Sequence, residues 1–431
     1  AGEPVPEALK VEIEAGDAWL TAARALWLEA LEQAGASLAD PDAGGAPPAQ
    51  ASEALQGTLA QADPTAAILQ IVVGAQRTYL LLTTAKAQAA HTVQVSAEVL
   101  NAEVAALRRA VGDPRAPYRA AAEQVYRRVI EPVRGELNAA GVKTLVVSLD
   151  GALRYVPLAA LVDPATGRHL VERFALARYH DAARGQLERQ GPTAWRVAGL
   201  GVTEAKAGFT PLPAVGRELE AIVRRAADDP DGVAEGIVRL DAEFDRSTLA
   251  AALAGPFPGV HLASHFQFKP GVDRSSFLLL GDGAQLTVAD LWAGSFDFKG
   301  VDLLVLSACE TAVDGGDGRE VDGLAGVVQR RGVRSVVASL WPVADDSTAT
   351  LMARFYEAMT SGTPRAQALQ AAQRTFLAGA SAAKGVKPGA TEATRGVARA
   401  DGGGAGFVAD PERPYAHPYY WAPFVLMGAW R

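Results

Sequence analysis

The sequence of 431 residues has very little cysteine: Cys309 is the only one. One cysteine cannot build an intramolecular disulfide framework, and it excludes zinc sites of the CxxC type. So few thiols fit a reducing compartment. Ala and Gly are abundant and Lys is scarce next to Arg, which is typical of a GC-rich bacterial genome. We therefore expect a bacterial, cytoplasmic protein.

Basic residues are also in deficit. The chain has 41 Lys and Arg against 49 Asp and Glu, a net charge of −8, whereas a nucleic-acid-binding protein would carry basic clusters. No run of about 18 apolar residues occurs, so we expect no membrane span. The chain begins at Ala1 without a methionine or a signal-like stretch. We expect it to be a trimmed or processed piece of a longer protein.

Several site motifs are missing. The sequence has no GxxxxGK[ST], GxSxG or HExxH pattern, and 199–201 (GLG) falls far short of a dinucleotide fingerprint. We therefore expect no cofactor, and a nucleotide-binding domain is the least favoured alternative. The acidic segment 314–322 lacks the full spacing of a calcium loop. A mobile loop is the favoured interpretation of this segment, with metal binding as the second.

Hydrophobic periodicity divides the chain into three parts. Residues 1–64 have a helical period and a Gly/Pro linker, residues 65–190 form a first α/β half, and residues 194–431 form a second one. The strands expected to matter most are 67–73 and 78–83 (a hairpin), 144–148, 170–179, 196–201, 259–264, 303–306, 335–340 and 418–430. Expected helices include 118–137, bent at Pro132, and 214–227, with Glu and Arg on its outer face. Alternating strands and helices predict an α/β fold with a mostly parallel sheet.

The only thiol follows one of these strands. The apolar run 303–306 leads directly to Cys309 and is typical of a buried strand in a parallel sheet. In open α/β sheets, ligands and chemistry gather beyond the carboxyl ends of the strands. Cys309 is therefore a candidate nucleophile. The alternative is a small buried apolar side chain, as most free cysteines are.

A histidine follows a second strand in the same way. HLASHF places His265 at the end of strand 259–264, so an imidazole and a thiol meet there if the strands are neighbours. The imidazole can take the thiol proton and later protonate a leaving amine. The structural alternative is a strand cap whose ring bonds a backbone carbonyl. His261 lies roughly 13 Å from the end of the strand, and we interpret it as structural.

Acidic residues follow a third strand, 335–340, in the segment LWPVADD. An acid at this edge could receive a basic substrate side chain through a charge-assisted hydrogen bond. The alternative is an N-cap of the next helix. We expect Asp345 near the pocket and Asp346 or Ser347 at the cap.

Five segments in this order resemble the CHAT domain: HLASHF, SSFLLLGDGAQLTVADL, VDLLVLSACETA, GLAGVVQRRGVRSVVASLWPVADDST and HPYYWAPFVLMG. CHAT domains are bacterial members of the caspase–separase clan of cysteine peptidases, and they often follow tetratricopeptide repeats in longer chains. The resemblance runs from about residue 66 to residue 431. It implies a caspase-like sheet flanked by helices, with an inactive caspase-like half, 65–190, before the active one.

The resemblance also implies site residues. His265 and Cys309 match the family's dyad, and the oxyanion hole would be formed by the backbone N–H groups of Cys309 and Phe266. Many relatives have glycine in place of Phe266, so a bulky side chain would narrow the site here. LWPVAD is similar to the separase segment whose acid receives the arginine before the cut bond. This likeness implies that Asp345 selects a basic residue, although relatives vary in this preference.

The expected function is that of a cysteine endopeptidase that acts on a protein substrate. Its expected regulators are a partner protein, a repeat domain outside this chain, or cleavage of a loop. The alternative is a caspase-like scaffold without activity, which the retention of both His265 and Cys309 disfavours.

The loop 379–413 is the expected cleavage site. It is rich in Gly and Ala and carries Lys384, Lys387, Arg395 and Arg399. If Asp345 selects basic residues, the wild-type protein should be cut within this loop, whereas Cys309→Ala should stay whole. Intact-mass analysis of both proteins checks this, and identical masses would contradict self-cleavage.

Overall fold

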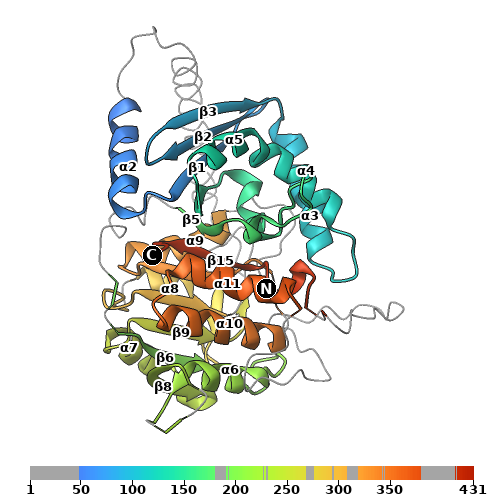
Figure 1. Ribbon diagram of the computed structural model, residues 1–431. Coiled ribbons are helices and arrows are strands. Elements are labelled where there is room, and N and C mark those ends of the chain that lie inside the picture. Colours follow the sequence, from blue (N-terminus) through green and yellow to red (C-terminus); the bar gives the residue numbers. More distant parts are fainter. Residues whose placement is uncertain are drawn as a thin grey trace, which may run out of the picture.

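The structure is a computed structural model that describes residues 48–179, 191–192, 194–226, 228–229, 232–267, 276–293, 296–307, 319–341, 343, 345–379, 413 and 415–431. These residues form one 12-stranded sheet with helices on both faces and a separate three-stranded sheet (Figure 1). Most neighbouring strands of the large sheet run parallel. The predicted α/β class, a mostly parallel sheet flanked by helices, is confirmed.

The first part of the sheet has the strand order β3-β2-β1-β4-β5. Its strands are β1 (Ala66–Val73), β2 (Thr78–Thr84), β3 (Gln88–Val93), β4 (Thr144–Ser148) and β5 (Ala175–Arg178). Its helices are α2 (Pro48–Ala62), α3 (Ala97–Val111), α4 (Arg119–Val129) and α5 (Arg134–Ala139), with short 3₁₀ turns η1 (Glu131–Val133), η2 (Gly151–Tyr155), η3 (Leu158–Ala160) and η4 (Leu170–Glu172). β1 and β2 pair antiparallel as the predicted hairpin.

Two predictions for this part are wrong in detail. The single helix expected over 118–137 is divided into α4 and α5, because Pro132 lies in η1 and has no N–H to continue the helical ladder. The strand expected over 170–179 is limited to β5. Its first residues form η4, where the side chain of Glu172 accepts a hydrogen bond from the backbone N–H of His169 over 2.6 Å.

The second part of the sheet has the order β15-β14-β13-β9-β6-β8-β7. Its strands are β6 (Arg196–Gly201), β7 (Val223–Arg224), β8 (Ala234–Leu240), β9 (Gly259–Ala263), β13 (Leu303–Leu306), β14 (Ser335–Ser339) and β15 (Phe424–Gly428). Its helices are α6 (Ala214–Ile222), α7 (Arg246–Ala254), α8 (Val288–Trp292), α9 (Arg319–Arg330), α10 (Asp345–Thr360) and α11 (Arg365–Leu377). The small sheet contains β10 (Phe266–Gln267), β11 (Phe277–Leu279) and β12 (Gln285–Thr287). Across the described residues, no helix combines the length and the apolar character that a membrane span requires.

Alternation along β9 assigns helices to the two faces of this part of the sheet. His261 points to one face, where it contacts Glu218 of α6 and Tyr356 of α10. Leu262 points to the other face, where it lies with apolar side chains of α7, α8 and α9. Positions two apart share a face of a strand, so the face of His261 is the one that leads to His265.

Four predictions for the second part are corrected by the structure. The helix expected over 214–227 ends at Ile222, because the β-branched Val223 begins β7 and pairs with β8. Glu218 of this helix is fully buried instead of lying on its outer face. The cap expected at Asp346 or Ser347 is also wrong, since α10 already begins at Asp345. The C-terminal strand expected from residue 418 begins only at Phe424, after the 3₁₀ turn η8 (Pro418–Tyr420).

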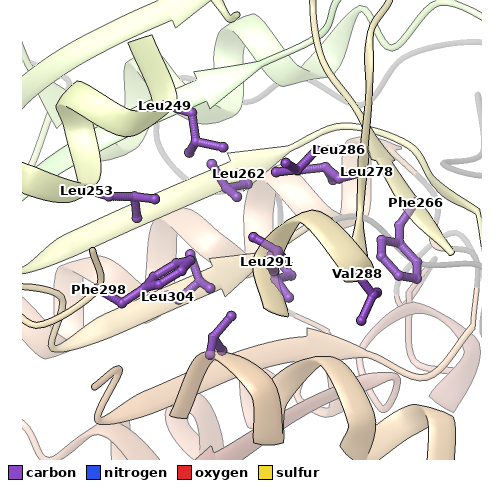
Figure 2. Close-up of a pocket in the computed structure, with 12 residues that line it drawn as sticks. Leu249, Leu253, Leu262, Phe266, Leu278, Leu286, Val288, Leu291, Phe298 and Leu304 are labelled. Carbon is purple, nitrogen blue, oxygen red and sulfur yellow. The ribbon is translucent and has the colours of Figure 1, made fainter. Parts of the chain in front are cut away.

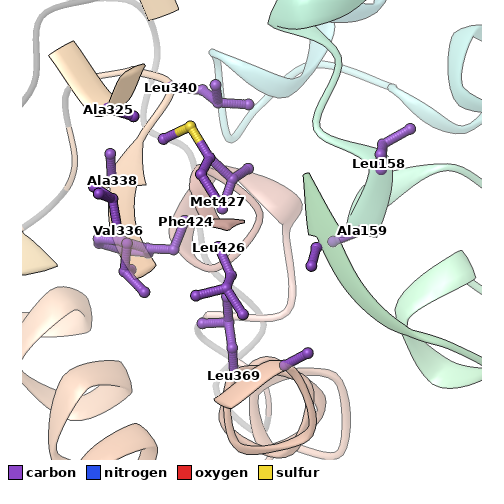
Figure 3. Close-up of a cluster of buried hydrophobic side chains, with 14 of the residues drawn as sticks. Leu158, Ala159, Ala325, Val336, Ala338, Leu340, Leu369, Phe424, Leu426 and Met427 are labelled. Carbon is purple, nitrogen blue, oxygen red and sulfur yellow. The ribbon is translucent and has the colours of Figure 1, made fainter. Parts of the chain in front are cut away.

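The two parts of the sheet are joined by the last strand of the chain. β15 pairs antiparallel with β14 and parallel with β5, where Met427 is the partner of Arg178. Buried side chains of β14, β15, α9 and α11 meet η3 at this junction (Figure 3). The division of the chain near residue 190 into an inactive and an active half stays a prediction, and the sheet runs without interruption across it.

The first part contains a histidine whose ionisation should affect stability. Burial, and then the charge of Arg119, lower the pKa of His169 to about 4, from about 6.5 in an unfolded chain. Between these values the unfolded state binds more protons than the folded state, so stability decreases as the pH falls from 6.5 to 4. The expected loss from His169 is roughly 3 kcal/mol at pH 4. Urea unfolding across this range checks it: His169→Gln should flatten the dependence, and an unchanged slope would contradict it.

Candidate active site

The three strands that precede the predicted site residues are neighbours in the sheet. β13 lies between β9 and β14 and runs parallel to both. Leu306, the last residue of β13, has Leu262 of β9 as its partner on one side and Ala338 of β14 on the other. The strands that precede His265, Cys309 and Asp345 are therefore adjacent, as the site prediction requires.

Cys309 lies outside the described residues, together with most of the acidic segment that follows it. The last described residue before it is Ser307, whose backbone N–H donates to Leu262 O over 2.9 Å. The ladder between β9 and β13 thus continues one residue beyond the strand, toward Cys309.

His265 is completely buried at the end of β9. Its Nε2 lies 2.9 Å from the backbone oxygen of Thr210, and the ring of Phe209 lies 4.8 Å away, centroid to centroid. A carbonyl oxygen can only accept, so Nε2 carries a proton and Nδ1 is the proton-accepting atom of a neutral ring. This carbonyl bond is the contact that the structural alternative predicts. It equally fixes the tautomer and the orientation that a general base needs.

Phe266 follows His265 and begins β10. Its side chain lines a small cavity with Leu278 and Val288 (Figure 2), so its bulk is accommodated on the face that carries α7 and α8. Its backbone pairs with Leu278 of β11. At the preceding position Leu279 N donates to His265 O over 2.9 Å. Hydrogen-bonded and non-hydrogen-bonded pairs alternate in antiparallel ladders, so the N–H of Phe266 is turned away from β11.

The cavity itself is apolar and has a volume of about 30 Å³. Its lining comes from the sheet, α7, α8, α9 and the β11–β12 hairpin: Leu249, Leu253, Leu262, Phe266, Leu278, Leu286, Val288, Leu291, Phe298, Leu304, Leu306 and Val328. This volume is little more than one water molecule occupies, and without polar partners such a cavity stays dry. It holds the Phe266 side chain on the face of β9 opposite to that of His261.

A buried polar network lies on the face of β9 that carries His261, beneath the strand ends. His261 Nε2 is 3.0 Å from Oε1 of Glu218, and the hydroxyl of Ser307 donates to the same oxygen over 3.1 Å. The hydroxyl of Tyr356 is 3.3 Å from His261 Nδ1. All four side chains are completely buried. His261 therefore has the structural role that its place in the sequence suggested.

Glu218 and Ser307 were not recognised in the sequence. The position of Glu218 in the helix indicates burial, because it lies on the same face of α6 as the buried residues Val215, Leu219 and Ile222. Charge alone had assigned it to the outer face. Ser307 gave no signal, since a serine at a strand end is common.

Asp345 is the first residue of α10, which follows β14. Contacts with distant segments hold the residues that precede it. Arg108 of α3 donates to the carbonyl of Leu340 over 3.4 Å, and the indole N–H of Trp341 donates to Tyr419 O over 3.1 Å. The segment that leads to Asp345 is thereby tied both to the first part of the chain and to the C-terminal segment.

The comparisons with known proteins give one matching family and solved structures of low sequence identity. A family model described as the CHAT domain matches residues 119–429, and no curated protein matches the chain. Two crystal structures of the Saccharomyces cerevisiae separase–securin complex are similar, with TM-scores of 0.48 and 0.49, each at 9% identity over 87% of this chain. They are covered over 30% and 31% of their own length, so this chain spans about a third of the separase chains. The Arg-specific cysteine proteinase gingipain R is similar with a TM-score of 0.41 at 8% identity, over 72% of this chain and 67% of that chain.

Proposed function

The chain belongs to the CHAT domain family, and from this membership we propose that it is a cysteine endopeptidase whose catalytic dyad is His265 and Cys309. The observation that carries the proposal is the parallel pairing of β9 with β13. Leu262 and Leu306 are partners, and each dyad residue lies three positions after one of them: His265 after Leu262 and Cys309 after Leu306. An equal offset from paired residues supports a meeting of the two side chains at the edge of the sheet.

The contacts of His265 support its role as the general base. The hydrogen bond from Nε2 to Thr210 O directs the accepting Nδ1 away from that carbonyl. It also stabilises the imidazolium that forms when His265 takes the thiol proton. A free thiol has a pKa of about 8.5, so without such a base little thiolate is present at neutral pH.

The proposed reaction is acyl transfer in two steps. The proton of Cys309 moves to His265 Nδ1, and the thiolate attacks the carbonyl carbon of the scissile peptide bond. The N–H of Phe266, turned away from β11, and that of Cys309 stabilise the oxyanion. The imidazolium then protonates the leaving amine, which leaves a thioester. Water, deprotonated by His265, attacks the thioester, and the carboxylic acid product and the free thiol are released.

The same proposal includes specificity and regulation. Asp345, the first residue of the helix that follows β14, would receive a basic side chain of a protein substrate. His265 has no exposed surface and is covered by Phe209, so access to the base requires a rearrangement. This burial supports control by a partner protein or by a further domain of a longer chain.

An arginyl peptide with an electrophilic warhead tests the proposal directly. Because the chain has one cysteine, the mass added by a thiol-directed probe reports Cys309 alone. Wild-type protein should be labelled, and both Cys309→Ala and His265→Ala should lose the labelling. Wild-type protein that stays unlabelled, with or without a basic residue in the probe, would favour either the scaffold alternative or an enzyme that needs its activator first.

A further inference from the structure

One carboxylate beneath the sheet edge connects the two strands that lead to the dyad. Glu218 of α6 is completely buried, and its Oε1 contacts both His261 and Ser307. His261 belongs to β9, four residues before His265. Ser307 directly follows β13, two residues before Cys309. The carboxylate therefore holds both strands, β13 two residues before Cys309 and β9 four residues before His265.

The direction of each hydrogen bond follows from the groups involved. Burial, and then the negative charge of Glu218, raise the pKa of Tyr356 well above its ordinary value. Its hydroxyl therefore stays protonated and can donate to His261 Nδ1. A carboxylate oxygen can only accept, so the bond between His261 Nε2 and Glu218 Oε1 is donated by the imidazole. With the Ser307 hydroxyl, two donors converge on one carboxylate oxygen, which offsets part of the cost of its burial.

Ser307 is fixed from two directions. Its backbone N–H bonds Leu262 O over 2.9 Å, and its hydroxyl bonds Glu218 Oε1 over 3.1 Å. The first bond belongs to the sheet, and the second reaches a helix that covers the sheet. The chain thus leaves the sheet toward Cys309 from a residue whose backbone and side chain are both held.

We propose that Glu218 is a positioning residue, which sets the placement of Cys309 relative to His265 through Ser307 and His261. This inference rests on the proposed function of the dyad. A residue that only stabilises the fold affects the unfolding temperature. A positioning residue also affects the rate, because a displacement of about 1 Å in a reacting group can cost about 100-fold.

The test uses Ser307→Ala, Glu218→Gln and the double variant. Ser307→Ala removes one oxygen, and Glu218→Gln keeps the shape and removes the charge. Ser335→Ala is the matched control for the serine: Ser335 is also completely buried and donates one bond, to Ala429 O over 2.8 Å, at the far end of β14. Glu220→Gln is the control for the acid, since Glu220 lies on the same helix with its side chain 59% exposed.

Two readouts are measured on folded protein: peptide cleavage, and the rate at which iodoacetamide alkylates the only cysteine at pH 7. Each single variant should lower kcat by roughly 10- to 100-fold at an unchanged KM. Alkylation should slow by about threefold or more, because Cys309 loses its placement beside the base. Since both residues act through one contact, the double variant should be no slower than the slower single variant. Ser335→Ala and Glu220→Gln should match the wild type in both readouts, whatever their unfolding temperatures.

Three results would overturn the positioning role. In the first, Ser307→Ala and Glu218→Gln both keep kcat and the alkylation rate within about twofold of the wild-type values. Another is a double variant whose loss equals the product of the single losses. The third is a wild-type thiol that alkylates no faster than free cysteine and does not respond to either substitution. If Glu218→Gln does not fold, Ser307→Ala alone decides. If the wild type cleaves no peptide but its alkylation depends on Ser307, the positioning role stands and the peptidase proposal fails.

Discussion

Cys309→Ala should lower kcat/KM for a peptide substrate by about 10⁴-fold or more, because in the proposed mechanism the thiolate forms the covalent intermediate. His265→Ala should cost a similar factor at pH 7. The double variant should be no slower than either single variant, since a nucleophile and its base act as a unit. The measurement is steady-state cleavage of a fluorogenic peptide by each purified variant.

The pH dependence separates a lost base from a damaged fold. In His265→Ala the thiol should titrate near 8.5, which leaves about 3% thiolate at pH 7. Its remaining activity should therefore increase between pH 7 and pH 9. His91→Ala is the control, because His91 lies on β3 at the far edge of the sheet, and it should keep wild-type kinetics. Full activity of His265→Ala at pH 7 would contradict the dyad.

Sequence reasoning was most successful where local pattern and chemistry coincide. The short apolar runs that end at His265, Cys309 and Asp345 were expected to be parallel strands with a common edge, and β9, β13 and β14 are neighbours in that sheet. Each run is buried on both faces, which gives the continuous apolar signal of a central parallel strand. The adjacency itself has no local signature and depended on the resemblance to a known family.

Long-range pairing explains what was missed. β15 comes last in the chain but lies in the middle of the sheet, between β14 and β5. A strand of five buried residues carries no information about its neighbours. Glu218 is the corresponding case for side chains. Its charge predicted exposure, whereas two donors more than 40 residues away, His261 and Ser307, make burial acceptable. Partners so distant in sequence cannot be read from a helical pattern.

Asp345→Asn should lower kcat/KM for cleavage after arginine by about 10²- to 10³-fold, which corresponds to the loss of one partner from a desolvated charge pair. The amide keeps the size of the side chain but cannot neutralise a guanidinium. Cleavage after an uncharged residue should change little, so the preference for arginine over that residue should collapse. Alkylation of Cys309 should stay at the wild-type rate, because β13 and β9 are not affected.

Asp346→Asn is the matched control for this prediction. Both acids lie in the first turn of α10, where a negative charge is favoured by the N-terminal end of the helix dipole at about 0.3–1 kcal/mol. The two variants therefore lose the same helix stabilisation, and only Asp345→Asn should lose specificity. Equal losses in both variants would assign the effect to the helix and not to substrate binding. A peptide library in which wild-type protein cuts after small or apolar residues would remove the basis for the role of Asp345, while leaving the dyad untouched.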